Sequence, residues 1–143
     1  MKKILFVICA TMLAFAAEAK DSELKIAYDQ IPAKAQSFVS EYYPTAVVKK
    51  STQRFDDGIA VYKVYLKDKT AIEFDMIGAW NIVEASKKMS VSVEILPAKI
   101  KNTLASNFAD KKIKKVGNDG YIYDFNFTDG TKVKINANGV TVE

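Results

Sequence analysis

The sequence predicts an α+β fold in which two tandem repeats, each a helix followed by four antiparallel strands, form one continuous sheet with both helices on one face. Three observations predict it: a segment of the first half recurs in the second, apolar residues recur at helical spacing at the start of each copy, and two-residue alternation follows. A helix with one apolar stripe and a sheet with one apolar face bury those surfaces by packing together. The other face of the sheet is then expected to remain open.

The repeat begins with Ile31-Pro32-Ala33-Lys34, which recurs as Leu96-Pro97-Ala98-Lys99 at an offset of 65 residues. After a hairpin that is shorter in the second copy, the offset becomes 61, and the alternating apolar residues still match. These residues are Tyr62, Val64 and Leu66 in the first copy and Tyr123, Phe125 and Phe127 in the second. We therefore expect a leader at 20–30, a first repeat at 31–86, a connector at 87–95 and a second repeat at 96–143.

Within each repeat the helix comes first, because Pro32 and Pro97 suit a first helical turn, where a missing N–H costs nothing. Pro44 ends the first helix. The strands are expected at 46–54, 60–67, 70–76 and 79–85, and then at 112–117, 121–128, 131–136 and 139–143. Glycine-containing pairs mark hairpin turns, since glycine accepts a positive φ, and they are Asp57-Gly58, Asp119-Gly120, Asp129-Gly130 and Asn138-Gly139.

Residues 1–19 have the pattern of a secretory signal peptide, with two lysines, an apolar run and a cleavage site at Ala17-Glu18-Ala19. Cleavage there leaves 19 basic and 16 acidic residues and removes Cys9, which is the only cysteine. No later apolar run approaches the roughly 20 residues of a membrane helix, so no integral membrane segment is expected after cleavage. The expected location is periplasmic or secreted.

Composition also limits the chemistry. The chain contains no histidine, and its one cysteine lies in the predicted signal peptide. Soft metals then lack their usual ligands, and nucleophilic catalysis lacks both cysteine and the Ser–His pair. We therefore expect no cofactor, no metal site, no catalytic residue and no enzymatic activity.

A family resemblance rests on the order of these motifs. Ile31-Pro32-Ala33, then Tyr62-x-Val64-x-Leu66, then Glu73-Phe74-Asp75-x-x-Gly78-x-Trp80, repeated in weaker form, resemble the PepSY-like family of small exported bacterial proteins. That family is similar in fold to the β-lactamase inhibitory protein. The resemblance covers residues 31–143 and implies a binding or inhibitory module without catalytic residues. Lys69 departs from the pattern, because the family usually has glycine there, and this implies a different turn or some strain.

Two charged patterns have alternative interpretations. Glu73 and Asp75 lie two apart on a predicted strand, about 7 Å from one another, which suits an inverting glycosidase pair but also a solvated face. The same pair could bind calcium with Asp56-Asp57 or Asn118-Asp119, although these clusters end in glycine as hairpin turns do.

Paired lysines could indicate nucleic acid, but Arg54 is the only arginine and export separates the protein from nucleic acid. We interpret these charges as solvated and expect no nucleic-acid partner.

The leading hypothesis is a non-catalytic binding protein that uses the open sheet face against an unidentified protein, with an exported hydrolase as one candidate. Tyr65 is the expected anchor, since an aromatic side chain on that face offers the most apolar area. The alternative is a carrier that holds a small molecule or glycan between helix and sheet. A competing location for a protein partner is the hairpin tips around 57–58 and 118–120. The candidate binding residues are Lys63, Tyr65, Lys67, Glu73, Asp75, Trp80, Tyr121, Asp124 and Asn126.

Overall fold

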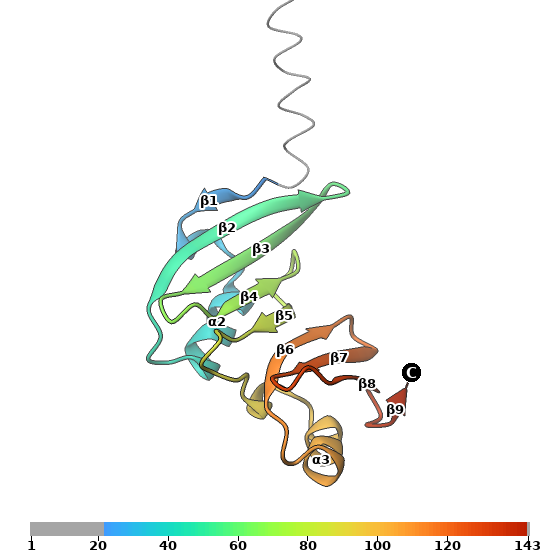
Figure 1. Ribbon diagram of the computed structural model, residues 1–143. Coiled ribbons are helices and arrows are strands. Elements are labelled where there is room, and N and C mark those ends of the chain that lie inside the picture. The colour runs from blue at the N-terminus through green and yellow to red at the C-terminus, as the bar shows by residue number, and fades with distance from the viewer. Residues whose placement is uncertain (1–21, 143) are drawn as a thin grey trace, which may run out of the picture.

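The computed structural model describes residues 22–142, so the expected signal peptide at 1–19 lies outside the described residues. These described residues form nine strands, two α-helices and two short 3-10 helices (Figure 1). In chain order they are β1 (Leu24–Ile26), η1 (Tyr28–Gln30), α2 (Ala33–Tyr42), β2 (Val48–Asp56), β3 (Ile59–Leu66), β4 (Ala71–Phe74), β5 (Trp80–Glu84), η2 (Val93–Ile95), α3 (Ala98–Asn107), β6 (Ile113–Asn118), β7 (Ile122–Phe127), β8 (Lys132–Asn136) and β9 (Thr141–Val142).

The nine strands form one antiparallel sheet in which each strand pairs with the next along the chain, from β1 to β9. Pairing of β5 with β6 joins the two repeats, with Ile82 opposite Gly117 and Val83 opposite Val116. The sheet is strongly twisted, so that the β6–β9 half is turned away from the β1–β5 half in Figure 1. The predicted fold class is confirmed: this is an α+β fold with one continuous sheet.

Both helices cover the same face of the sheet. Phe38 of α2 meets Phe74 of β4 edge-on, with ring centroids 5.6 Å apart. Phe108, which caps α3, stacks on Phe127 of β7 at 5.7 Å. The inward residues of all the central strands belong to one buried cluster, including Val64, Leu66, Phe74, Phe125, Phe127 and Ile135. The two-residue alternation therefore predicts the covered face correctly.

Two glycines seat the helices on the sheet. A Cβ on Gly78, in the β4–β5 turn, would lie 2.8 Å from the Ala35 backbone nitrogen in the first turn of α2. A Cβ on Gly139, in the β8–β9 turn, would lie 2.8 Å from the Lys99 carbonyl oxygen of α3. These glycines are equivalent positions of the repeat, so each helix begins directly against a hairpin turn of its own unit.

The expected leader at 20–30 contains β1 and η1. Ile26 of β1 pairs with Ser51 of β2. The connector repeats this arrangement 65 residues later: Val91 forms an antiparallel bridge with Ile113, and the 3-10 helix η2 follows it. The sheet therefore has nine strands, one more than the eight that were predicted, and the additional strand is β1.

Lys69 takes a left-handed conformation with φ of 77°, and its equivalent in the second repeat is Gly130, with φ of 91°. A residue with a side chain is strained in this region. The expectation of strain at this departure from the family pattern is therefore confirmed, and the turn keeps the same shape in both repeats.

Candidate binding face of the sheet

The side of the sheet opposite the helices is here called the open face. The strand pairing places five of the nine predicted binding residues on it. Lys63 lies opposite Glu73, and Tyr65 opposite Ala71, in the first unit. In the second unit, Asp124 lies between Gly117 and Lys134, and Asn126 between Lys115 and Lys132. These five residues, from β3, β4 and β7, are Lys63, Tyr65, Glu73, Asp124 and Asn126.

The other four lie elsewhere. Lys67 is exposed just beyond the end of β3, at the turn into β4. Trp80 points to the covered side, where its ring centroid is 6.3 Å from Phe38 and 6.1 Å from Tyr123, so it packs between the two units. Tyr121 is 78% exposed on the β6–β7 hairpin. The fourth residue, Asp75, lies in the turn between β4 and β5.

Asp75 belongs to a turn rather than to the open face. Its carboxylate accepts hydrogen bonds from the backbone N–H groups of Ile77 and Ala79, at 3.0 and 2.9 Å. The register shifts between Glu73 and Phe74, so the two-residue alternation that predicted Asp75 beside Glu73 ends there. Glu73 instead pairs with Arg54, with the guanidinium nitrogen 3.2 Å from the carboxylate. The structure does not bring Glu73 and Asp75 together as a glycosidase pair.

Tyr65 is held among charged groups from β2, from β3 and from the residue preceding β1. Its hydroxyl donates to the Glu23 carboxylate, with oxygen–oxygen distances of 2.8 and 3.1 Å. The ammonium groups of Lys50 and Lys63 lie 4.7 and 5.0 Å from its ring centroid, within the range of cation–π attraction. Burial, together with the Glu23 hydrogen bond, raises the pKa of Tyr65 to about 12. The ring that was expected to be free for a partner is therefore already engaged by neighbours.

Arg54 completes this half of the face. The hydrogen bond to Glu73 raises the pKa of the Arg54 guanidinium. Sequence reasoning did not connect Glu23, Lys50 and Arg54 with Tyr65, because strand pairing alone brings these residues together. The first-unit half is thus a pre-formed, internally paired surface.

The second-unit half of the open face is hollow. A depression of about 680 Å³ is lined by residues of β5 to β9, including Ile82, Gly117 and Val142. A second depression of about 540 Å³ continues it toward the β6–β7 hairpin. The two share five lining residues, Ile82, Gly117, Asp124, Lys134 and Val142, and we call them together the Gly117 groove. A lone glycine inside a strand pattern was the available sequence signal for this groove.

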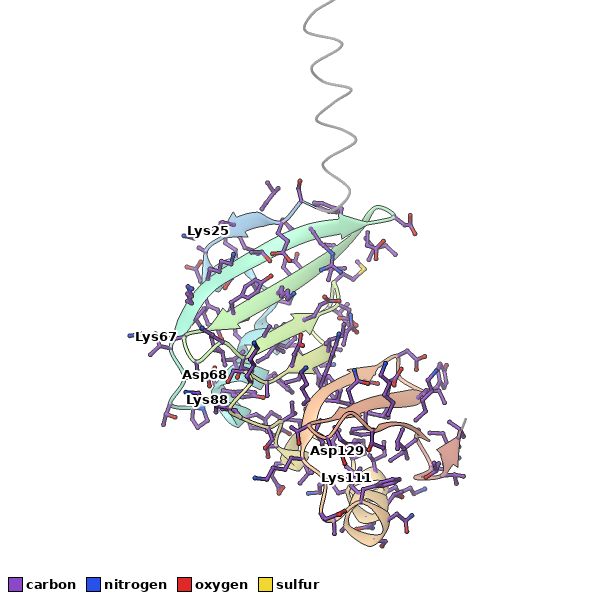
Figure 2. All side chains as sticks on the ribbon, in the orientation of Figure 1. Lys25, Lys67, Asp68, Lys88, Lys111 and Asp129 are labelled. Carbon is purple, nitrogen blue, oxygen red and sulfur yellow. The ribbon has the colours of Figure 1, made fainter. Side chains whose placement is uncertain are left out.

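A basic hollow lies at the end of the sheet where β3 turns into β4. Five lysines line it, against the acidic residues Asp68 and Glu84. Figure 2 shows Lys67, Asp68 and Lys88 gathered there. The Asp68 carboxylate accepts the Thr70 backbone N–H at 2.8 Å, so it stabilises its own turn.

At this same end of the sheet, one further lysine is neutralised by an acidic partner. Lys111 lies beside Asp129 in Figure 2, with nitrogen and oxygen 2.6 Å apart. This contact and the Thr131 backbone N–H hold the pKa of Asp129 well below its usual range.

Comparison with known protein families identifies the family of this tandem-repeat fold. The chain belongs to the PepSY-like family, because the family model described as "putative beta-lactamase-inhibitor-like, PepSY-like" matches residues 60–142. The family named from the sequence motifs is thereby confirmed. No curated protein matches the chain significantly.

Solved structures from Bacteroides share the fold. A "putative calcium-regulated periplasmic protein" of Bacteroides thetaiotaomicron is 27% identical with a TM-score of 0.78, over 86% of this chain and 96% of that one. A putative periplasmic protein of Bacteroides vulgatus has the same identity, TM-score and coverage. A second Bacteroides vulgatus protein, of unknown function, is 18% identical with a TM-score of 0.78, over 85% of this chain and 98% of that one, and it shows the fold alone.

These neighbours confirm the periplasmic location expected from the sequence. No helix within residues 22–142 is long and apolar enough to cross a membrane.

Proposed function

We propose that this chain is a non-catalytic periplasmic binding protein that contacts a protein partner through the open face of its sheet. The observation that carries the proposal is the asymmetry of the fold, in which both helices cover one face and nine strands present rigid rows of side chains on the other. The "inhibitor-like" description of the family supports a binding role. An exported hydrolase is the partner class that this description favours.

Engagement of the carboxylates supports a role without catalysis. Glu73 is paired with Arg54, and Asp75 accepts two backbone N–H groups of its own turn. Neither carboxylate is left free to act as the general acid or the general base that hydrolysis of glycosides requires.

Packing favours a protein partner over the carrier alternative. The space between helices and sheet is filled by inward side chains, since Val64, Phe74 and Phe125 are fully buried against one another and the helices. The hollows described above lie on the surface instead. A ligand between helix and sheet would need these buried side chains to move.

The calcium regulation attributed to the Bacteroides thetaiotaomicron neighbour has no comparable support in this chain. The Asp119 carboxylate accepts the backbone N–H groups of Tyr121 and Ile122, which lowers its pKa, and Asp75 is likewise committed to its turn. Within residues 22–142, no three acidic, histidine or cysteine residues are grouped as metal ligands. A calcium titration followed by thermal unfolding tests whether the ion stabilises the chain.

The test of the proposed function is affinity capture from native periplasm with charge-reversed variants. Lys63→Glu with Lys134→Glu changes both halves of the open face. Lys34→Glu with Lys99→Glu is the matched control, because these exposed lysines are equivalent residues at the start of the two helices. We expect the face variant to lose the captured partner and the control to retain it.

Equal recovery by both variants would remove the open face from the proposal. Capture that is lost only when the 55–60 hairpin is shortened would move the site to the hairpin tips, where Phe55 and Ile59 are 52% and 53% exposed. Circular dichroism of each variant checks that the fold is intact.

A further inference from the structure

Gly117 is the penultimate residue of β6 and pairs with both neighbouring strands, yet neither its backbone nor its packing requires glycine. Its φ is outside the left-handed region, so any residue can adopt this conformation. A Cβ there would meet the Asn81 carbonyl oxygen at 3.9 Å and the Asp124 Cβ at 4.0 Å, which are ordinary contact distances. Glycine within a strand weakens the strand and often marks a place where another molecule approaches closely.

The missing side chain opens the floor of the Gly117 groove. Ile82 lies directly opposite Gly117 on β5, and Val142 lies farther across the face on β9. Both side chains are partly exposed, so the floor is apolar and accessible. This floor has the size and chemistry to receive one bulky apolar side chain.

The sides of the groove are basic. Three lysines, Lys115, Lys132 and Lys134, line the larger depression together with one acidic residue, Asp124. None of these lysines forms an ion pair with another described residue, whereas Arg54 and Lys111 elsewhere in the fold do. Unpaired lysines around an apolar floor leave an excess of positive charge that favours carboxylates.

The basic hollow at the β3–β4 turn extends this charge. Its lining includes Lys114, which precedes Lys115 of the groove. It also includes Glu84, which lies opposite Lys115 in the register of β5 and β6. A partner chain that leaves the groove in this direction meets further lysines, among them Lys67 and Lys88. The charge therefore continues along one path.

We propose that the Gly117 groove is the docking site for an acidic polypeptide segment of the partner. One bulky apolar side chain of that segment lies over Gly117, between Ile82 and Val142, and its carboxylates lie against Lys115, Lys132 and Lys134. The inference rests on the proposed function and deepens it, because it names the half of the open face that binds and the chemistry of the partner. The apolar floor favours a polypeptide over an anionic lipid surface, which would use the lysines alone.

The test begins with selection of random peptides displayed on phage against the chain from Lys20 onward. Selected peptides should be enriched in Asp and Glu around an aromatic or large aliphatic residue. Gly117→Val fills the groove and should weaken their binding by about tenfold or more, while thermal stability is kept or raised because β-branched residues favour strands. Val61→Ile is the control, since it enlarges a side chain on the first-unit half of the open face, outside both the groove and the basic hollow, and should leave affinity unchanged.

A second arm changes charge without filling the groove. Lys134→Gln should lower the affinity of the selected peptides and reduce its dependence on salt. Peptides without acidic enrichment, or peptides that bind Gly117→Val as well as the parent chain, would overturn the inference. The inference would also be overturned if the chain bound phosphatidylglycerol vesicles more strongly than any peptide and Gly117→Val left this vesicle binding unchanged.

The outcomes also separate the inference from the proposed function. Peptides that bind Gly117→Val normally but lose binding with Lys63→Glu would place the site on the first-unit half, so the inference fails and the open-face function stands. Peptides insensitive to every change on the open face would contradict both.

Discussion

Replacement of Gly78 by alanine tests how the helices are seated on the sheet. Gly78 has a φ of 96°, and an added Cβ would lie 2.8 Å from the Ala35 nitrogen and 2.9 Å from the Lys34 Cβ. Both neighbours belong to the first turn of α2, so the methyl group cannot be accommodated by rotation of a flexible side chain. The helix or the β4–β5 turn has to move.

The expected cost has two parts. Left-handed backbone strain contributes about 1–2 kcal/mol for a residue with a Cβ. Overlap in a well-packed contact adds about 1–3 kcal/mol. Gly130→Ala isolates the first part, because Gly130 has a φ of 91° but no atom within 4 Å of an added Cβ. We therefore expect Gly78→Ala to lower the free energy of unfolding by about 2–5 kcal/mol, and Gly130→Ala by about 1–2 kcal/mol.

The assay is urea unfolding, followed by circular dichroism and by the fluorescence of Trp80, whose ring lies near α2 through Phe38. Gly139→Ala should behave as Gly78→Ala does, since its Cβ would meet the Lys99 carbonyl oxygen at 2.8 Å. If Gly78→Ala and Gly139→Ala cost no more than Gly130→Ala, close helix seating is not what these two glycines provide.

Three further predictions follow from the fold and the Tyr65 cluster. Lys69→Gly should raise the free energy of unfolding by about 1 kcal/mol, because glycine relieves the strain at a φ of 77°. Lys69→Ala should leave the free energy of unfolding unchanged, and equal effects of the two changes in urea unfolding would contradict this prediction. The Tyr65 phenol should ionise near pH 12 in an ultraviolet difference titration against Tyr65→Phe, and ionisation near pH 10 would refute its burial against Glu23. Because this pKa is raised on folding, the stabilisation is complete below pH 10 and is lost as the pH rises toward 12. Residues 20–90 alone should lack a cooperative unfolding transition, since β6 and Tyr123 complete the sheet and core of this fragment. Cooperative unfolding of the fragment with the same free energy as the whole chain would contradict a shared core.

Local patterns predicted most of the fold. Alternation in Val64 and Leu66, and in Phe125 and Phe127, identified the covered face, and all four side chains are buried there. The strand β1 was missed because three residues are too few to show a period. Its counterpart at Val91, 65 residues later, was the signal that could have revealed it.

The candidate site was less predictable, because its contacts depend on strand register. The hydrogen bond from Tyr65 to Glu23 joins residues 42 positions apart. Asp75 leaves the face at a register shift that the sequence pattern does not show. The Gly117 groove requires β5 to β9 to be aligned side by side, which no local pattern specifies.

The central claim is that a partner contacts the open face around Gly117, and an NMR cross-saturation measurement on the captured complex tests it most directly. The chain is isotope-labelled, the partner is saturated, and the loss of amide signal is mapped onto the sheet. The account predicts the strongest losses at Ile82, Lys115 and Gly117, with α2 and α3 unaffected. Losses confined to the helices, or to the hairpin tips at Phe55 and Tyr121, would contradict it.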